Sequence, residues 1–212
     1  MKTSLGFRSY RLCVISLLLT AQFCGWGCKN PFKTRSSPPP VVTQGTWETP
    51  AEPKIVLQNL LHAYAERIMV NFAQCLSDSF RFSAPEDSVD AVNQGRADLF
   101  AQWDRSAEIS VTTNIFSTFS PNNDSLSYVL SFQSIPPVPD DITDTVAVLS
   151  RNYELSVLNL TSTPPETTLV KGTATFYMKQ SFLSWWSIYF WSDIQASPGN
   201  DDWADFKARF RK

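Results

Sequence analysis

The chain has 212 residues, of which 43% are hydrophobic and 18% charged, a composition typical of a folded domain rather than of a disordered chain. With 18 Lys and Arg against 20 Asp and Glu, it lacks the basic excess that binding a phosphate backbone uses, so we expect no nucleic-acid partner. One His, seven Gly and no glycine-rich stretch argue against a His-based metal site, a His-dependent triad or a nucleotide loop, and we expect no cofactor.

The amino terminus has the pattern of a secretory signal. Lys2, Arg8 and Arg11 precede an almost unbroken apolar run, LCVISLLLTAQF, over residues 12–23. A run of about 12 residues is too short to span a bilayer core, which needs roughly 20. We therefore expect a cleaved signal rather than a permanent transmembrane anchor.

The segment after this run resembles the cleavage region of a bacterial lipoprotein precursor, in which the signal is cut immediately before a cysteine that carries lipid. Small Gly27 precedes Cys28, whereas bulky Phe23 precedes Cys24, so a peptidase that needs a small residue there favours Cys28. The resemblance implies a signal peptide over residues 1–27, lipidation at Cys28 and a periplasm-facing place in the cell envelope, with the outer membrane favoured over the inner. The alternative is an ordinary secreted protein that is cut near the same place.

Removal of residues 1–27 would leave 18 minus 3, or 15, basic residues against 20 acidic ones, a net charge of −5. It would also leave Cys75 as the one cysteine of the folded part, without an intramolecular disulfide. Cys75 lies in an apolar stretch with no His near it in sequence, so we interpret it as a core residue rather than a nucleophile. His62 is interpreted as a helix-surface or half-buried residue, since no second His could share a metal with it.

The mature chain divides into a tether and one domain. Residues 28–50 are rich in Pro, Ser and Thr and include Pro38-Pro39-Pro40, which favours an extended tether that contributes little buried area. Residues 51–212 are predicted to form a single α+β domain.

Several helices are predicted from apolar spacings of three and four and from capping residues. A long helix is expected over residues 53–68 and a second, shorter one over residues 72–78, before a short strand at 80–82. A third helix, capped by Asp87 or Ser88, is expected to reach Asp104. A final helix over residues 203–210 is expected to be capped by the acidic stretch Asn200-Asp201-Asp202.

Residues 107–119 fit two interpretations, because their apolar residues match both a strand and a helix face. Their Val, Ile and Thr content favours a strand. Further strands are expected from residue 126 to 132 and from 146 to 161, where a change in apolar alternation indicates a bulge.

The last two strands alternate more clearly. Around Gly172, which allows a bend, one face carries Val170, Ala174, Phe176 and Met178. In the last strand, Trp186, Ile188, Phe190 and Ile194 are expected on one face and Trp185, Tyr189, Trp191 and Asp193 on the other. Both faces of that strand carry aromatic residues, so we expect both to be covered.

Helices followed by several long strands indicate an α+β arrangement, in which the helices cover one face of a mostly antiparallel sheet. This order resembles the nuclear transport factor 2-like (SnoaL-like) fold, in which a long amino-terminal helix lies in the concavity of a curved antiparallel sheet and forms a cone. The resemblance implies that residues 53–68 are the long helix and that the strands from residue 126 to 194 form the sheet.

The chain also resembles a loose group of bacterial lipoproteins with this kind of domain. Their precursors have a Cys-x-Asn-Pro motif, a Pro-rich tether, an amino-terminal helix, a Trp-rich strand and a Trp-x-x-Phe/Leu-Lys-x-x-Phe helix. The matching residues here are Cys28-Lys29-Asn30-Pro31, Val56 to Tyr64, Trp185 to Asp193 and Trp203 to Phe210. This likeness implies a fold and a location, and no chemistry.

Some proteins with this fold are isomerases, dehydratases or epoxide hydrolases that use carboxylates, His or Tyr inside the cone. The corresponding candidates here are Tyr64, Asp78, Arg81, Glu154 and Asp193. The simpler interpretation makes Asp78 and Arg81 a surface ion pair and Glu154 a solvent-facing strand residue. We therefore assign no catalytic residue and no metal ligand.

The sequence favours a non-catalytic envelope lipoprotein with a binding or scaffold role, because large side chains such as Phe176 and Trp186 can fill the cone. Its expected partners are the membrane, through the lipid anchor, and an envelope protein or an apolar small ligand. The alternative is a small-molecule enzyme of the isomerase, dehydratase or hydrolase type that uses carboxylates in the cone.

Overall fold

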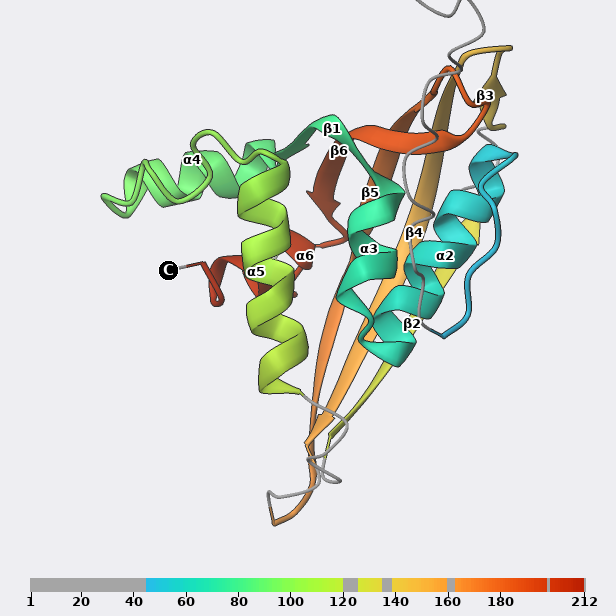
Figure 1. Cartoon of the computed structure of the whole chain (residues 1–212). Helices are drawn as coiled ribbons and strands as arrows, with labels where there is room; N and C mark the ends of the chain where they lie inside the picture. Colours follow the sequence, from blue (N-terminus) through green and yellow to red (C-terminus); the bar gives the residue numbers. More distant parts are fainter. Residues whose placement is uncertain (1–44, 120–125, 135–138, 160–162, 198, 212) are drawn as a thin grey trace, which may run out of the picture. The chain divides into compact units, whose positions relative to one another are not determined.

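A computed structural model describes residues 45–119, 126–134, 139–159, 163–197 and 199–211 (Figure 1). The predicted signal peptide, Cys28 and the tether as far as residue 44 lie outside the described residues. Within the described part of the chain, no helix is long and apolar enough to cross a membrane.

The described strands form one mixed sheet with the spatial order β1-β6-β5-β4-β2, to which β3 adds beside β4. The strands are β1 (Leu76–Ser83), β2 (Leu126–Ser134), β3 (Asp141–Ile142), β4 (Val146–Asn159), β5 (Glu166–Gln180) and β6 (Trp186–Gln195). Every pair is antiparallel except β1 with β6, which run parallel. The sheet is therefore mostly antiparallel, as predicted.

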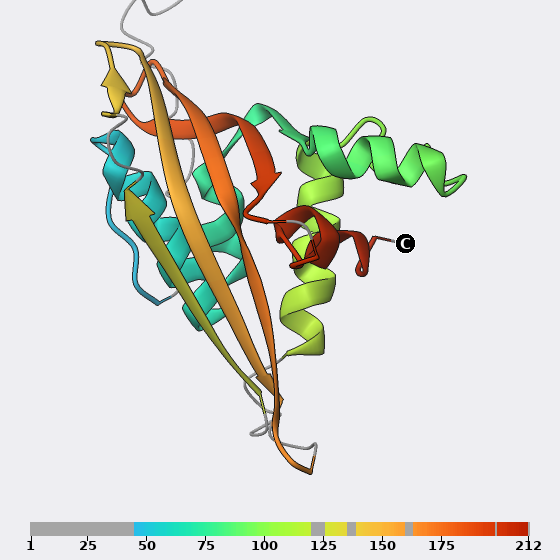
Figure 2. The same ribbon diagram turned by 180° about the vertical axis from the view of Figure 1, so that it is seen from behind.

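The helices gather on one side of the long strands, as Figures 1 and 2 show from opposite directions. They are α2 (Pro53–Glu66), α3 (Met69–Cys75), α4 (Pro85–Asn93), α5 (Arg105–Thr118) and α6 (Trp203–Ala208). The expected α+β arrangement, with amino-terminal helices packed on the inner face of a curved sheet, is confirmed.

The first two helices end earlier than the apolar spacing predicts. Arg67 adopts a left-handed conformation (φ 55°), and its backbone N–H caps α2 on the carbonyls of Ala63 and Tyr64. The chain then enters α3, which ends at Cys75 because the next residues pair with β6 as strand β1. Cys75 is buried in the core, as expected.

The interpretation of residues 107–119 as a strand is wrong, because they belong to α5. The Asp104 carboxylate caps this helix by accepting from the backbone N–H groups of Ser106 and Ala107, both at 3.0 Å. Val111, Ile115 and Phe116 then lie on one buried stripe. Capping and burial of this stripe outweigh the β propensity of its Val, Ile and Thr residues.

The third helix is also shorter than predicted. It begins at Pro85, with Ala84 at the N-cap, and ends at Asn93. Neither Asp87 nor Ser88 caps it, because a proline in the first turn sets the start instead. Val89 and Val92 of this helix are exposed.

The bulge predicted in the segment of β4 and the regular alternation predicted in β6 are both wrong. β4 pairs with β5 without interruption and buries its odd-numbered residues, such as Leu149 and Tyr153, so the predicted bulge is absent there. The irregularity lies in β6, where Met178 pairs with Ile188 but Tyr177 pairs with Phe190. The extra residue, Tyr189, changes which side chains face the core.

After this irregularity, Trp191 and Asp193 share the buried face with Trp186 and Ile188. The predicted grouping of Phe190 and Ile194 with that face is therefore wrong, and Ile194 is 44% exposed. The alternation predicted for β5 is confirmed, since its four expected core residues are fully buried: Val170, Ala174, Phe176 and Met178.

Residues 45–50, which composition assigns to the tether, lie against the helices and the sheet. The Asn59 side-chain amide exchanges two hydrogen bonds with the backbone of Glu48, and the backbone N–H of Trp186 donates to the carbonyl of Pro50. Trp47 packs against the core. The folded part of the chain thus includes these residues.

Gly172 of β5 leaves a space that the side chain of Tyr153, on the neighbouring strand β4, occupies. A Cβ atom at this position would lie 2.4 Å from the Tyr153 hydroxyl oxygen and 2.7 Å from the carbonyl oxygen of Ile194. Tyr153 is paired with Gly172 across the strands, and its ring crosses the strand at this point. The missing side chain leaves space for Tyr153, and the pairing of β5 with β4 and β6 continues without interruption at Gly172.

Replacement of Gly172 by Ala should therefore lower the free energy of unfolding by about 1–3 kcal/mol, because the backbone carbonyl of Ile194 cannot move aside without disrupting β6. Urea denaturation measures the change. Thr173→Ala, at the neighbouring and partly exposed position, is the control and should cost roughly 0.5 kcal/mol or less. Equal stability of Gly172→Ala and the wild type would contradict this account of the site.

Candidate functional site

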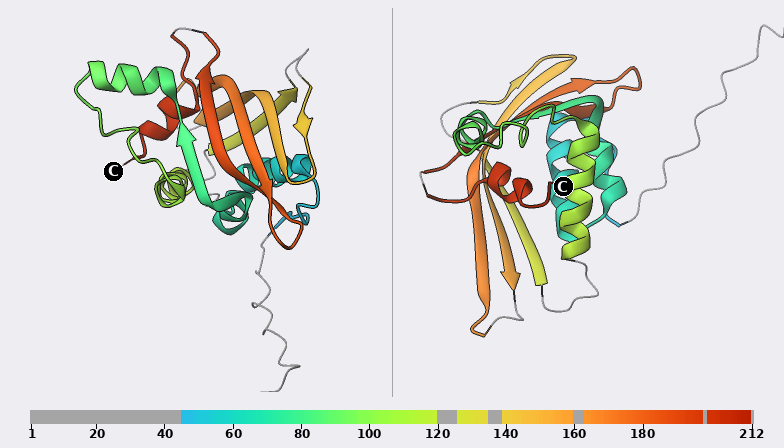
Figure 3. Two further views of the ribbon diagram at one scale, coloured as in Figure 1. Left: turned by 90° about the horizontal axis from the view of Figure 1, so that it is seen from above. Right: turned by 90° about the vertical axis from the view of Figure 1, so that its left-hand side faces the viewer.

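The inner side of the curved sheet is occupied by the short helix α6, which lies between the long strands and α5 (Figure 3). Asp202 caps α6 by accepting from the backbone N–H of Asp205 at 2.9 Å, so the predicted acidic cap is confirmed. The Trp203 side chain is fully buried, and its indole N–H donates to the Tyr64 hydroxyl at 3.0 Å. Helix α6 therefore lies against the inner side of the sheet, with Trp203 fully buried there.

Aromatic rings surround Trp203 on several sides. Its ring centroid lies 4.2 Å from that of Trp191, 4.8 Å from that of Tyr153 and 5.3 Å from that of Tyr64. These residues come from β6, β4 and α2, so one side chain of α6 joins both layers of the domain. Edge-to-face contacts of this kind add to the stabilisation that burial of the rings provides.

Next to Trp203, a buried ion pair joins α6 to α5. The Lys207 ammonium lies 2.8 Å from a carboxylate oxygen of Glu108, and both side chains are completely buried. The other Glu108 oxygen accepts from the indole N–H of Trp103 at 2.8 Å. The ammonium also lies 3.7 Å from the ring centroid of Trp191 and 4.0 Å from that of Phe82, which provides two cation–π contacts.

Burial lowers the pKa of Lys207, and the neighbouring carboxylates of Glu108 and Asp193 oppose this shift. A buried ammonium without a counter-ion would lose its proton, so Glu108 is what allows the charged form to persist here. The ion pair therefore joins α6 to α5 through two fully buried charged groups. We interpret it as a structural element of the domain.

Asp193, one of the predicted candidates, is fully buried beside the start of α6. Its carboxylate accepts from the Tyr153 hydroxyl at 3.1 Å and from the backbone N–H of Ala204 at 3.0 Å. Burial is the main cause that raises its pKa, followed by the charge of Asp202. The Tyr153 hydroxyl also accepts from the backbone N–H of Trp203 at 2.6 Å, so both side chains hold the first turn of α6.

The other predicted candidates do not converge with Asp193. Tyr64 is buried and bonded to Trp203, as described above. Asp78 is exposed and lies 4.0 Å from Arg105, so the expected Asp78–Arg81 pair is not formed, and the Arg81 guanidinium donates to the carbonyl of Phe80. The arrangement therefore contains no pair of candidate side chains that face a common substrate.

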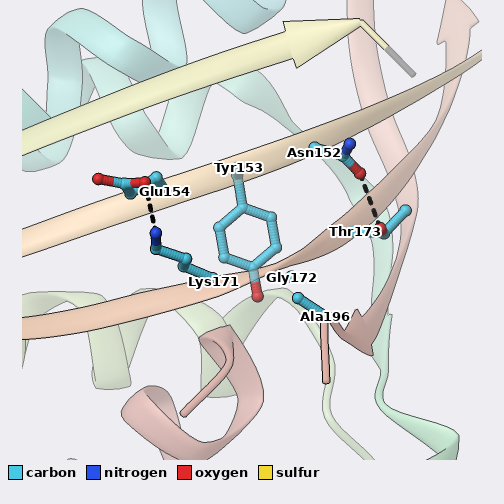
Figure 4. A pocket seen from close by; sticks show the side chains of 7 residues that line it. All are labelled: Asn152, Tyr153, Glu154, Lys171, Gly172, Thr173 and Ala196. Atoms are coloured by element: carbon cyan, nitrogen blue, oxygen red, sulfur yellow. Dashed lines mark hydrogen bonds and ion pairs between the residues drawn. The ribbon is translucent and has the colours of Figure 1, made fainter. Parts of the chain in front are cut away.

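Glu154, the remaining candidate, is solvent-facing as the simpler interpretation predicted. Its carboxylate forms an exposed ion pair with Lys171 at 3.0 Å. The pair lies at the rim of a shallow pocket of about 330 Å³ that surrounds Gly172 (Figure 4). The opposite rim consists of Asn152 and Thr173, joined by a hydrogen bond of 3.0 Å.

This pocket is polar and its rim side chains satisfy one another. Between the two rim pairs, the ring of Tyr153 passes Gly172, and Ala196 closes one side (Figure 4). The Tyr153 hydroxyl is already engaged with Asp193 and Trp203. We find no arrangement of a nucleophile and a base in this pocket.

Sequence reasoning missed Glu108 and Lys207, the two residues with the most unusual environment. Charged residues are usually exposed, so a lysine between Phe206 and Ala208 gave no signal by itself. Glu108 could have been found if residues 107–119 had been interpreted as a helix, since it lies three and seven positions before Val111 and Ile115 on the buried stripe.

A second surface feature is an exposed apolar end of the sheet, at the tip of the β5–β6 hairpin. Phe182 is 91% exposed, and Leu183 and Trp185 are each close to half exposed. The backbone N–H of Gln180 donates to the carbonyl of Thr145, which brings the exposed side chains of Ile142 and Val146 to the same end of the sheet. We name this group of five side chains the tip patch: Ile142, Val146, Phe182, Leu183 and Trp185.

The buried ion pair gives a testable prediction about stability. Lys207→Met should cost roughly 3–5 kcal/mol, because it leaves the Glu108 carboxylate buried without its counter-ion. Glu108→Gln combined with Lys207→Met should recover most of this loss, because both charges and their desolvation cost are removed while the amide oxygen can still accept from the Trp103 indole N–H. Denaturant titrations of both variants measure the difference. A double variant as unstable as Lys207→Met would show that the pair is not the origin of the loss.

Comparisons with known proteins find solved structures of low similarity to this chain. No family model and no curated protein matches the chain. A ketosteroid isomerase-like protein from Erwinia carotovora atroseptica matches 70% of this chain and 97% of its own, with 10% identity and a TM-score of 0.46. A nuclear transport factor 2-like superfamily protein from Salmonella enterica serovar Typhimurium matches 68% of this chain and 89% of its own, with 11% identity and a TM-score of 0.45.

A conserved protein from Planctomyces limnophilus matches 66% of this chain and 91% of its own, with 12% identity and a TM-score of 0.43. Identities and TM-scores at this level give no information about activity. The element order, the curved mixed sheet and the helices on its inner face are properties of the chain itself. The chain therefore has an α+β fold with the arrangement that its sequence resemblance to the nuclear transport factor 2-like fold implies.

Proposed function

We propose that the protein is a non-catalytic lipoprotein of the bacterial cell envelope, with a binding or scaffold role. The observation that supports the proposal is the packing of α6 against the inner side of the sheet, where Trp203 and the Glu108–Lys207 pair are fully buried. An isomerase, dehydratase or hydrolase that used Asp193 would require its carboxylate to meet a substrate. Its carboxylate is instead enclosed by Tyr153 and the backbone of Ala204.

The proposed location rests on the amino-terminal sequence. A basic start, a short apolar run and Gly27 before Cys28 favour cleavage before Cys28 and its lipidation. The tether from Cys28 onward would hold the domain away from the bilayer on the periplasmic side, with the outer membrane favoured. In this arrangement the lipid supplies the membrane affinity and leaves the domain surface free for another contact.

The tip patch is the surface that best suits a binding role, and we assign it to an envelope protein partner. Its centre is aromatic and apolar, while Asp141 and Asp144 are exposed in β3 and the turn that follows it. An apolar centre with a charged rim is typical of protein–protein contacts. Anionic lipid headgroups would repel the same carboxylates, which makes the membrane a poorer occupant of this surface.

Lipidation predicts the state of the mature amino terminus. Mass spectrometry of the protein from membranes should find Cys28 as the first residue, carrying acyl chains. Cys28→Ala should move the protein to the soluble fraction, because the acyl chains would be its anchor. Cys24→Ala is the control and should remain in the membrane fraction. An unmodified terminus, or one that starts elsewhere than Cys28, would refute the assignment.

The binding surface predicts where the domain contacts its partner. A photoreactive residue placed at Phe182 should give a discrete protein adduct in cells, whereas the same residue at exposed Val89 should give none. Replacement of Phe182 by Ser should remove that contact and change stability by about 0.5 kcal/mol or less, because the side chain is 91% exposed. Adducts with lipid alone would make the tip patch a membrane contact, and the absence of any adduct would contradict a binding role for it.

A further inference from the structure

The tip patch, to which the proposed binding role is assigned, is built on a closely hydrogen-bonded turn between β5 and β6. The backbone N–H of Ser181 donates to the carbonyl of Trp185 at 2.8 Å, and that of Ser184 donates to the carbonyl of Ser181 at 2.9 Å. The Ser181 hydroxyl accepts from the backbone N–H groups of Leu183 and Trp185, both at 3.3 Å. A surface that already has its bound shape loses little conformational entropy when a partner binds.

The same turn contains a strained residue. Ser184 has a φ of 61°, in the left-handed region that residues other than glycine rarely adopt. The Gln180 side-chain amide donates to the carbonyl of Ser184 at 3.3 Å, which helps to hold this conformation. Backbone strain of this kind is concentrated at functional sites, where it contributes to preorganisation. The turn thus presents the side chains of the hairpin tip in one fixed arrangement.

A second turn adds Ile142 and Val146 to the same platform. The backbone N–H of Thr143 donates to the carbonyl of Val146 at 2.9 Å, and the backbone N–H of Val146 donates to the Thr143 hydroxyl at 3.2 Å. The backbone N–H of Gln180 joins this turn to the hairpin by donating to the carbonyl of Thr145 at 2.9 Å. The apolar side chains of the tip patch therefore stand on two turns that are bonded to each other.

Phe182 projects from this platform. It is 91% exposed, whereas Leu183 is 49% and Trp185 47% exposed. Its ring therefore makes little contact with its own domain. A projecting aromatic side chain on a fixed turn is buried in a complex only if the partner supplies a pocket for it. The shape of the tip patch thus requires a concave surface on the partner.

The border of the tip patch on the β3 side is acidic. Asp141 directly precedes Ile142 and Asp144 follows it by two positions, and both aspartates are exposed. Among the described residues, neither takes part in an ion pair, while the preceding Asp140 is paired with Arg151. Two carboxylates without a counter-ion therefore border the apolar centre.

Lysine side chains do not neutralise these carboxylates. Lys179 is paired with Val146 across the strands, but its ammonium donates to the hydroxyl of Ser79 at 2.7 Å. Ser79 belongs to β1, so the Lys179 side chain reaches across β6, away from β3. Lys54, at the start of α2, is paired with Glu52 at 2.7 Å. The border on the β3 side therefore keeps its negative charge.

We propose that the partner at the tip patch is a protein with an apolar pocket for Phe182 that is bordered by Lys or Arg side chains. This inference rests on the proposed binding role of the patch and names the chemistry of its partner. The projecting ring requires the pocket, and Asp141 and Asp144 require the opposite charge at its border. A second copy of this chain does not fit, because its own tip patch would oppose carboxylates to carboxylates and one projecting ring to another.

The charge requirement is tested by photo-crosslinking of the full-length protein in isolated envelopes, with a photoreactive residue at Phe182. Asp141→Asn combined with Asp144→Asn should lower the yield of the protein adduct about fivefold, and Asp141→Lys combined with Asp144→Lys about 10-fold or more. An increase in NaCl from about 50 to about 300 mM should lower the yield of the wild type but not that of the double Asp→Asn variant.

The matched control is Asp98→Lys combined with Glu166→Lys. It changes the net charge by the same amount as the two lysine substitutions at the tip, at exposed positions outside the tip patch. Its adduct yield should equal that of the wild type. A fall in yield that is confined to the substitutions of Asp141 and Asp144 therefore reports local charge rather than the net charge of the protein.

The pocket requirement is tested with the photoreactive residue at the neighbouring position, Leu183, so that Phe182 can be varied. Phe182→Leu should keep a reduced adduct yield and Phe182→Ser should lower it about 10-fold or more, because the serine side chain cannot fill an apolar pocket. The thermal midpoints of the purified variants should stay close to that of the wild type, since the ring is 91% exposed. Mass spectrometry should locate the adducts on apolar residues that have Lys or Arg nearby in the partner.

Failure of this inference and failure of the proposed function give different results. A protein adduct whose yield does not respond to the aspartate substitutions would leave the binding role in place and overturn the basic border of the pocket. An equal yield with Phe182→Ser would overturn the pocket for the ring. Adducts with lipid alone, or no adduct from either position, would contradict the binding role of the tip patch and this inference with it.

Discussion

The contact on which the domain depends is the buried pair between Lys207 of α6 and Glu108 of α5. A six-residue helix cannot hold its place by its own backbone hydrogen bonds, because isolated helices of this length are unstable in water. The ion pair, the two rings beside the ammonium and the burial of Trp203 supply the missing stabilisation. Once α6 is fixed, Trp203 and Lys207 are fully buried beside the sheet and α5.

Much of the remaining geometry follows from the need to accommodate α6. Tyr153 reaches the backbone of Trp203 only because Gly172 presents no side chain in its path. Asp193 reaches Ala204 only because the extra residue in β6 turns its side chain inward. The glycine in β5 and the inserted residue in β6 therefore each allow a side chain of the sheet to contact α6.

The spacing of apolar residues predicted those parts of the fold that depend on a single helix or strand. The core face of β5 and the body of α2 are set by which residues are apolar, and both were predicted from their spacing. The face assignment in β6 failed because its irregularity depends on pairing with β5, which no single-strand pattern contains. The strand prediction for residues 107–119 failed because the Asp104 cap and the buried apolar stripe of α5 outweigh the β propensity of these residues.

The buried charges were harder to predict than the fold. Tyr64 and Asp193 were named as candidates, and both are buried. The partner of Tyr64, Trp203, lies 139 positions away, and the contact of Asp193 with the first turn of α6 depends on how α6 packs against the sheet. Asp87 likewise lies 115 and 118 positions before Asp202 and Asp205, whose carboxylates are close to it in the fold. The spacing of residues in one sequence does not predict such tertiary contacts. The polarity of each of these residues, taken alone, predicts that it is exposed.

The distance along the chain between α5 and α6 has a kinetic consequence. Two contacts join segments about a hundred residues apart: the Glu108–Lys207 ion pair and the pairing of Leu76 in β1 with Ile188 in β6. Neither contact can form before the later segment has been synthesised. Chains dominated by such non-local contacts fold slowly, since long loops must close before any stabilisation is gained. Until residues 203–207 have been synthesised and docked, the aromatic inner face of the sheet stays open to aggregation. Chaperone protection during that interval would matter more for this protein than for a helical bundle of the same length.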